Sequence, residues 1–151
     1  RYFYESFTSL DAALEAVLDQ IATEIEEVTL AAVEAVGDDP VARTKGTLEA
    51  FVELLAADPR KGRVAIIEAG AMPTLRHRRT QLIRHFAQLT GESAREIFGD
   101  TRNGDHGDQI AGLLFVGGMA ELITAWLEGA IDASPAEIVE TASRSFLGLY
   151  G

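Results

Sequence analysis

The stretch Ile110–Leu127, IAGLLFVGGMAELITAWL, decides the fold because it is long and almost wholly apolar. A membrane-spanning helix needs roughly 20 such residues, so this stretch is slightly short. Glu121 lies inside it, and its flanks carry Asp105, Asp108, Glu128 and Asp132. Because acidic flanks give no positive-inside anchor, the sequence favours a soluble chain in which this helix is buried on nearly every side over a membrane protein.

Projected at about 100° per residue, the stretch shows two different faces. One is bulky and typical of a core: Phe115, Met119, Leu122 and Trp126. The other is small: Ala111, Gly118, Ala125 and Gly129. Glycine inside a helix costs about 0.5–1 kcal/mol relative to alanine, so the pair Gly117–Gly118 suggests close approach of another helix. That helix belongs either to the same chain or, as we favour, to a partner subunit.

Helical periodicity continues towards the N-terminus. Apolar residues spaced by three, four and seven predict a long helix from Ser9 to Val36, capped by Ser9 or Thr8 and ended by Gly37. Asp39 and Pro40 then start a second helix, which stops before residue 59.

The middle and the C-terminal part follow the same pattern. A short helix is predicted over residues 60–70 and another from Pro73 to about Gly91. Residues 99–108, GDTRNGDHGD, have turn chemistry and predict a flexible loop. Ser134 and Glu137 form a capping box for the last helix. With no strand pattern, about six helices predict a single all-α domain.

The composition and the lack of known motifs exclude several classes of function. The 151 residues carry a net charge of −11, so bulk charge gives no support to nucleic-acid binding by this part. There is no cysteine, which excludes disulfides and thiol catalysis and favours the cytoplasm. No nucleophile motif or phosphate loop is present. We therefore expect a chain that is not an enzyme and that uses no cofactor or metal.

Three polar features leave alternatives open. His106, with Asp100, Asp105 and Asp108, is either a solvated loop or a weak site for a divalent ion. Residues 76–79, Arg-His-Arg-Arg, are either a solvated helix face or a site for a ligand carboxylate or phosphate. Glu68 or Glu121 with a nearby arginine would be the acid of a helical enzyme.

Residues 4–21, YESFTSLDAALEAVLDQI, resemble the junction of TetR-family transcriptional regulators, in which a recognition helix ends in Tyr-x-x-Phe and a long helix begins after a serine and an acid. Tyr4, Phe7, Ser9 and Asp11 match that pattern. Leu10 departs from it, because the family often has a lysine there that touches a DNA phosphate. The order of helices agrees with the same family.

The resemblance implies a ligand-responsive regulator, a repressor that a small apolar or amphipathic effector releases from operator DNA. Residues 1–7 would be the remnant of a helix-turn-helix domain that precedes them, with Arg1, Tyr2 and Tyr4 at the DNA. Residues 8–151 would bind effector and dimerise. The long helix would be the lever that joins the reading head to the pocket, and effector binding would change the spacing of two heads that read half-sites about 34 Å apart.

The family also implies where the sites lie. Pocket candidates, chosen by side-chain type among the middle helices, are Phe51, Leu55, Ile67, Met72, Phe86, Phe115, Met119 and Trp126, although core packing explains such residues equally well. The last two helices, 109–131 and 134–150, would pair with their mates as a four-helix bundle. The interface candidates are Ala111, Leu114, Gly118, Leu122, Ala125, Gly129, Val139, Phe146, Leu149 and Tyr150. The alternative function is a helical ligand-binding or scaffolding dimer without a DNA role.

Overall fold

The computed structural model describes the backbone of residues 2–151 and the side chains of residues 10–151, and this part of the chain contains helices and no strand. Residues 2–151 form six helical segments, as predicted, and the all-α class is confirmed. They are α1 (Tyr2–Ala35), α2 (Pro40–Ala57), a composite of α3 (Pro59–Gly62), the π-helix η1 (Arg63–Glu68) and α4 (Ala69–Ala71), then α5 (Pro73–Phe98), α6 (Gly104–Leu127) and α7 (Pro135–Tyr150).

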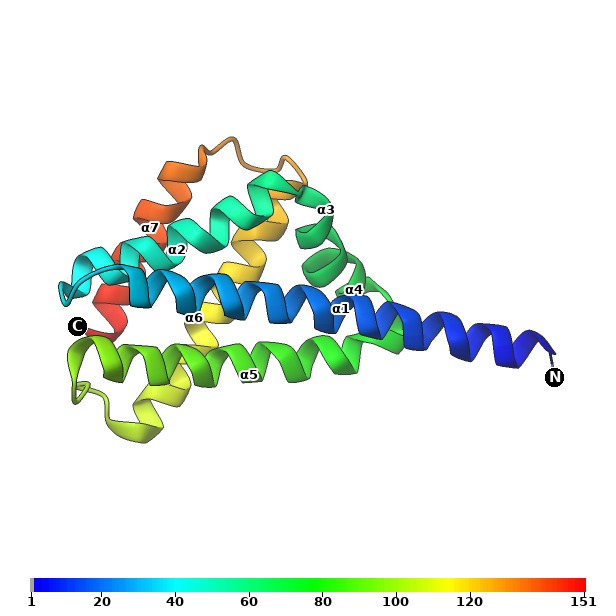
Figure 1. Cartoon of the computed structure of the whole chain (residues 1–151), viewed down its shortest axis with the longest axis horizontal. Coiled ribbons are helices and arrows are strands. Elements are labelled where there is room, and N and C mark those ends of the chain that lie inside the picture. Colours follow the sequence, from blue (N-terminus) through cyan, green and yellow to red (C-terminus); the bar gives the residue numbers. More distant parts are fainter. Residues whose placement is uncertain (1) are drawn as a thin grey trace.

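The helices α1 and α5 lie side by side and run in the same direction (Figure 1). Two polar contacts join them in one register: Arg78 Nε donates to Asp19 Oδ1 at 2.7 Å, and His85 Nε2 lies 3.3 Å from Glu26 Oε2. In both contacts the partners are 59 positions apart in the sequence. The N-terminal part of α1 extends beyond the rest of the molecule.

Local signals placed two helix starts correctly. Asp39 Oδ2 accepts from the Ala42 amide at 2.8 Å, and Pro40 occupies the first helical position. Ser134 and Glu137 form the predicted reciprocal capping box, at 3.2 and 2.7 Å.

Three predicted boundaries are wrong. The backbone is helical from Tyr2, so Ser9 does not cap α1; residues 5–8 contain no glycine or proline that would break the helix. Helix α5 passes through Gly91 to Phe98, and Gly91 is buried within it, beside Asp108 of α6. Helix α6 begins at Gly104, so the predicted loop shrinks to residues 99–103.

Helix α6 is less buried than predicted. Only 22% of the most apolar 18-residue stretch of α6 is buried. By length and composition alone, the helix is able to cross a membrane. Ile110, Leu113 and Leu114 are 58%, 49% and 64% exposed. A single copy of the chain therefore does not bury this helix on nearly every side, and a partner subunit would have to cover the exposed residues for that expectation to hold.

The close approach of helix backbones occurs at a different glycine from the ones expected. A Cβ on Gly112 would lie 2.4 Å from the carbonyl oxygen of Ala87, so α5 and α6 cross with their backbones in contact. A Cβ on Gly117 or Gly118 would meet nothing within 4 Å. The chain itself therefore gives no packing reason for these two glycines.

Candidate functional site

A cavity of about 270 Å³ lies between α1, α2, α5 and α6, with one wall formed by η1. Its walls are mostly aliphatic and aromatic, and include Leu18, Ile25, Val33, Leu48, Leu82 and Phe86. This volume is just below the range of about 300–1,000 Å³ typical of sites for drug-sized ligands. An apolar space of this size suits a small apolar or amphipathic molecule.

Half of the predicted pocket residues line this cavity. Phe51, Phe86, Phe115 and Met119 do so. Leu55, Ile67, Met72 and Trp126 are not part of the cavity wall.

Each of the four residues outside the cavity has another place in the structure. Leu55 is fully buried in the core, and Met72 packs on the cluster of Leu18, Ala69 and Leu75. Trp126 packs on the α2–α7 core, and its Nε1 donates to the Ala133 carbonyl at 3.0 Å. Ile67 lies in η1, whose wider turn brings its neighbour Ile66 to the cavity instead.

The sequence analysis placed the long helix at the pocket but named none of the residues with which α1 forms a wall of the cavity. Leu18, Ala22, Ile25, Thr29 and Val33 line the cavity at steps of three and four residues. The apolar stripe that predicted α1 was the available signal, but a stripe does not show whether it faces a core or a hollow.

Polar groups stand at the two ends of the cavity. Arg79 lines one end, and its Nε donates to the Ile66 carbonyl at 3.0 Å. Glu92, Ser93 and Glu96 line the other. Positions 79 and 93 on α5 are separated by roughly 20 Å at 1.5 Å per residue. The cavity is therefore long and carries opposite charges at its ends.

The basic cluster of residues 76–79 is divided by the fold. Arg78 pairs with Asp19, Arg76 donates to the Gly70 carbonyl at 3.3 Å, and His77 is exposed. Of the four, Arg79 alone lines the cavity.

The isolated acids Glu68 and Glu121 are exposed to solvent. The apolar surroundings that suggested a shifted catalytic acid are thus not present at either carboxylate.

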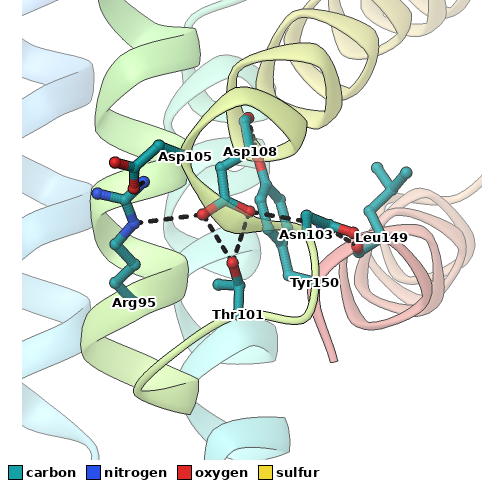
Figure 2. A network of polar contacts seen from close by, with 7 residues as sticks. All are labelled: Arg95, Thr101, Asn103, Asp105, Asp108, Leu149 and Tyr150. Carbon is teal, nitrogen blue, oxygen red and sulfur yellow. Dashed lines mark hydrogen bonds and ion pairs between the residues drawn. The ribbon is translucent and has the colours of Figure 1, made fainter.

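Asp108 is the centre of a second polar site (Figure 2). Its side chain is nearly inaccessible, at 2% exposure. Thr101 Oγ1 lies 2.7 Å from both carboxylate oxygens, Arg95 Nε donates at 3.2 Å, and Asn103 Nδ2 lies at 3.4 Å. Because these donors satisfy the carboxylate, the solvated loop predicted here is wrong for Asp108, while His106 is exposed.

The same site holds the C-terminal end of α7. The Asn103 side chain also donates to the Leu149 carbonyl at 2.8 Å, and the Tyr150 hydroxyl donates to the Asp108 carbonyl at 3.5 Å (Figure 2). Burial, with a smaller contribution from the Asp108 charge, raises the pKa of Tyr150 to about 12. This arrangement ties α5, α6 and α7 together and is structural in character.

A shallow groove between α6 and α7 contains part of the predicted interface. Leu114, Gly118, Leu122 and Leu149 line it.

The remaining interface candidates require correction. Ala111, Val139, Phe146 and Tyr150 are at most 6% exposed within the single chain, so they form its own core and offer no surface to a partner. Ala125 is half-buried and does not line the groove. Gly129 lies beyond the end of α6, with φ of 74° in the turn.

The DNA-contact candidates Arg1, Tyr2 and Tyr4 lie outside the residues whose side chains are described.

The cavity, the Asp108 site and the α6–α7 groove each combine residues from at least two helices. No protein-family model, curated protein or solved structure matches this chain.

Proposed function

We propose that the chain is the effector-sensing and dimerising body of a ligand-responsive transcriptional regulator with TetR-like organisation, a repressor that a small apolar or amphipathic molecule releases from operator DNA. The observation that carries the proposal is that α1 both lines the cavity, from Leu18 to Val33, and extends beyond the body at its N-terminal end (Figure 1). A helix-turn-helix head N-terminal to α1 would read the operator.

Coupling between cavity and head follows from the continuity of α1. The helix runs without interruption from Tyr2 to Ala35, so a displacement at Ile25 reaches the N-terminal end of the same rod. An effector that binds one orientation of α1 more tightly than another shifts the population towards the first. Two heads in a dimer then change their spacing and lose the fit to paired half-sites.

The surface of α6 supports dimerisation in this proposal. Its exposed apolar residues Ile110, Leu113 and Leu114 continue through Gly117 and Gly118 as one stripe at helical spacing. The glycines have open space in front of them, as close packing with a second helix requires. Pairing of α6 and α7 with their mates as a four-helix bundle would cover this stripe.

The exposed apolar stripe of α6 is better suited to contact a second copy of the chain than a lipid bilayer. Asp108 lies on the opposite side of the helix, buried against Arg95 of α5. Lipid on one side and a charged, fully hydrogen-bonded site on the other do not suit a single spanning helix.

The lever is tested with spin labels, since the chain contains no cysteine. A single cysteine at Leu10, which is 55% exposed on α1, carries one label per protomer. Pulsed electron–electron measurements on the dimer give the distance between the two labels. This distance should shift when dodecanoate, an amphipathic acid, is added at saturation. The matched label at Val41, 56% exposed on α2, should shift less, and equal or absent shifts with ligand bound would contradict the lever.

The DNA role is tested separately with the full product of the gene. It should retain a discrete set of genomic DNA fragments and release them when the effector is added. A product that binds ligand and dimerises but selects no fragment would instead be the ligand-binding or scaffolding dimer.

A further inference from the structure

We infer that Arg79 is the anchor for the carboxylate of an amphipathic acid whose hydrocarbon tail fills the cavity. The inference rests on the proposed function only in taking the cavity to be the effector site, and it names the chemical class of that effector.

Arg79 has the geometry of an unpaired anchor. Its Nε donates to the Ile66 carbonyl, which fixes the plane of the guanidinium at the cavity wall. Among residues 10–151, no carboxylate forms an ion pair with Arg79, whereas Asp19 neutralises its neighbour Arg78. Of the Arg79 nitrogens, only Nε has a hydrogen-bond partner within the described part of the chain, so the two terminal nitrogens are left for a ligand. Two parallel N–H groups of a guanidinium match the two oxygens of a carboxylate.

The surrounding backbone is shaped to hold this side chain. The π-turn of η1 presents the Ile66 carbonyl to Arg79. A Cβ at Gly70 would lie 3.3 Å from Arg79 Nε, so the glycine leaves room for the guanidinium to lie against α4. Single π-turns inside helices are frequent at functional sites.

The charged side chains of the cavity favour an anionic ligand group beside Arg79 over a cationic ligand group beside Glu92 and Glu96. Glu92 and Glu96 are exposed, and Gln88 already donates to Glu92 at 3.0 Å. Solvent screens such carboxylates, so an ion pair with them contributes little. Glu26, near the middle of the cavity, is engaged by His85. Arg79 is half-buried, where a pair is screened less.

The rest of the cavity fits a tail. Between Arg79 and Glu92, α5 contributes Leu82, Ile83, Phe86 and Leu89 to the wall. A space lined by these apolar residues over more than two turns of α5 suits an extended chain. Arg79 is the one cationic side chain among the described lining residues, which fits a singly charged carboxylate better than a doubly charged phosphate.

Three ligands with one tail and different heads test the inference: dodecanoate, dodecanol and dodecylamine, titrated calorimetrically below their micelle concentrations. Dodecanoate should bind the wild-type chain at least about tenfold more tightly than dodecanol, as expected for a charge-assisted hydrogen bond at a partly buried site. Dodecylamine should bind most weakly. In Arg79→Gln, the affinity for dodecanoate should fall about tenfold to that of dodecanol, while dodecanol binding stays unchanged.

Arg84→Gln is the control, because Arg84 is exposed on the same helix, does not line the cavity, and its loss changes the net charge equally. It should leave all three affinities as they are. Equal binding of dodecanoate and dodecanol, tightest binding of dodecylamine, or a dodecanoate loss as large in Arg84→Gln as in Arg79→Gln would overturn the inference while the cavity keeps its proposed role. If none of the three ligands binds, both the Arg79 inference and the amphipathic effector are wrong, and dimerisation and DNA selection remain separately testable.

Discussion

Asp108 and Tyr150 form a buried polar contact between α6 and α7. Both side chains are almost fully buried, and the carboxylate is satisfied by Arg95 and Thr101. A buried charge is tolerated only when its hydrogen-bonding capacity is filled. No sequence motif indicates this site, because Arg95 and Asp108 meet only when α6 folds back on α5.

The raised pKa of Tyr150 predicts a loss of stability at alkaline pH. The native state keeps the phenol proton up to about pH 12, whereas the unfolded chain loses it from about pH 10. Below pH 10 the contribution is fully present, and it is lost as the pH rises to 12, by up to about 2–3 kcal/mol. Tyr150→Phe should remove this part of the decline, measured as the difference between wild-type and variant in urea unfolding at pH 8 and pH 11.5. An identical decline in both proteins would contradict it.

At the scale of the elements, some helix boundaries follow from local sequence signals and others from tertiary contacts. Asp39–Pro40 and Ser134–Glu137 could be recognised from the sequence because a cap is made by residues three apart. The passage of α5 through Gly91, the early start of α6 and the π-turn of η1 could not, because packing against other helices decides them. The full lining of the cavity could not be predicted for the same reason, since it depends on how α1 and α5 pack, although four of the eight predicted pocket residues do line it.

The α5–α6 crossing predicts opposite effects for two alanine substitutions on one helix. Gly112→Ala forces a Cβ against the Ala87 carbonyl and should lower the free energy of unfolding by about 1–2 kcal/mol, even after the gain in helix propensity. Gly117→Ala meets open space and should be neutral or stabilising by up to about 1 kcal/mol. Urea midpoints at unchanged slope measure both. A neutral Gly112→Ala would mean that the helices separate at no cost.

For the whole molecule, the uncovered stripe of α6 is the feature that a single copy leaves unexplained. The stripe and the α6–α7 groove predict that the chain is a dimer in solution, joined through Leu114 and Gly118. The sequence indicated the apolar excess, but the buried candidates show that it could not separate core from surface.

Gly118→Leu should weaken this dimer without harming the protomer. A Cβ at this position meets nothing within 4 Å in a single copy, but the leucine side chain would hold two helices apart and raise the dissociation constant at least about tenfold. Sedimentation velocity over a range of concentrations measures it. Ala56→Leu, at an exposed site on α2, supplies the comparison, and a Gly118→Leu dimer as tight as wild type would remove α6 from the interface.

The two polar contacts between α1 and α5 have the same offset, which predicts that some movements of the long helix are easier than others. Asp19–Arg78 and Glu26–His85 stand seven residues apart on both helices, about two turns. Sliding α1 by one turn would rupture both at once and leave each carboxylate opposite the wrong residue. Tilting α1 about these two contacts keeps both intact. We therefore expect a displacement at the tip of α1 to tilt the helix rather than to slide it along α5 by a whole turn.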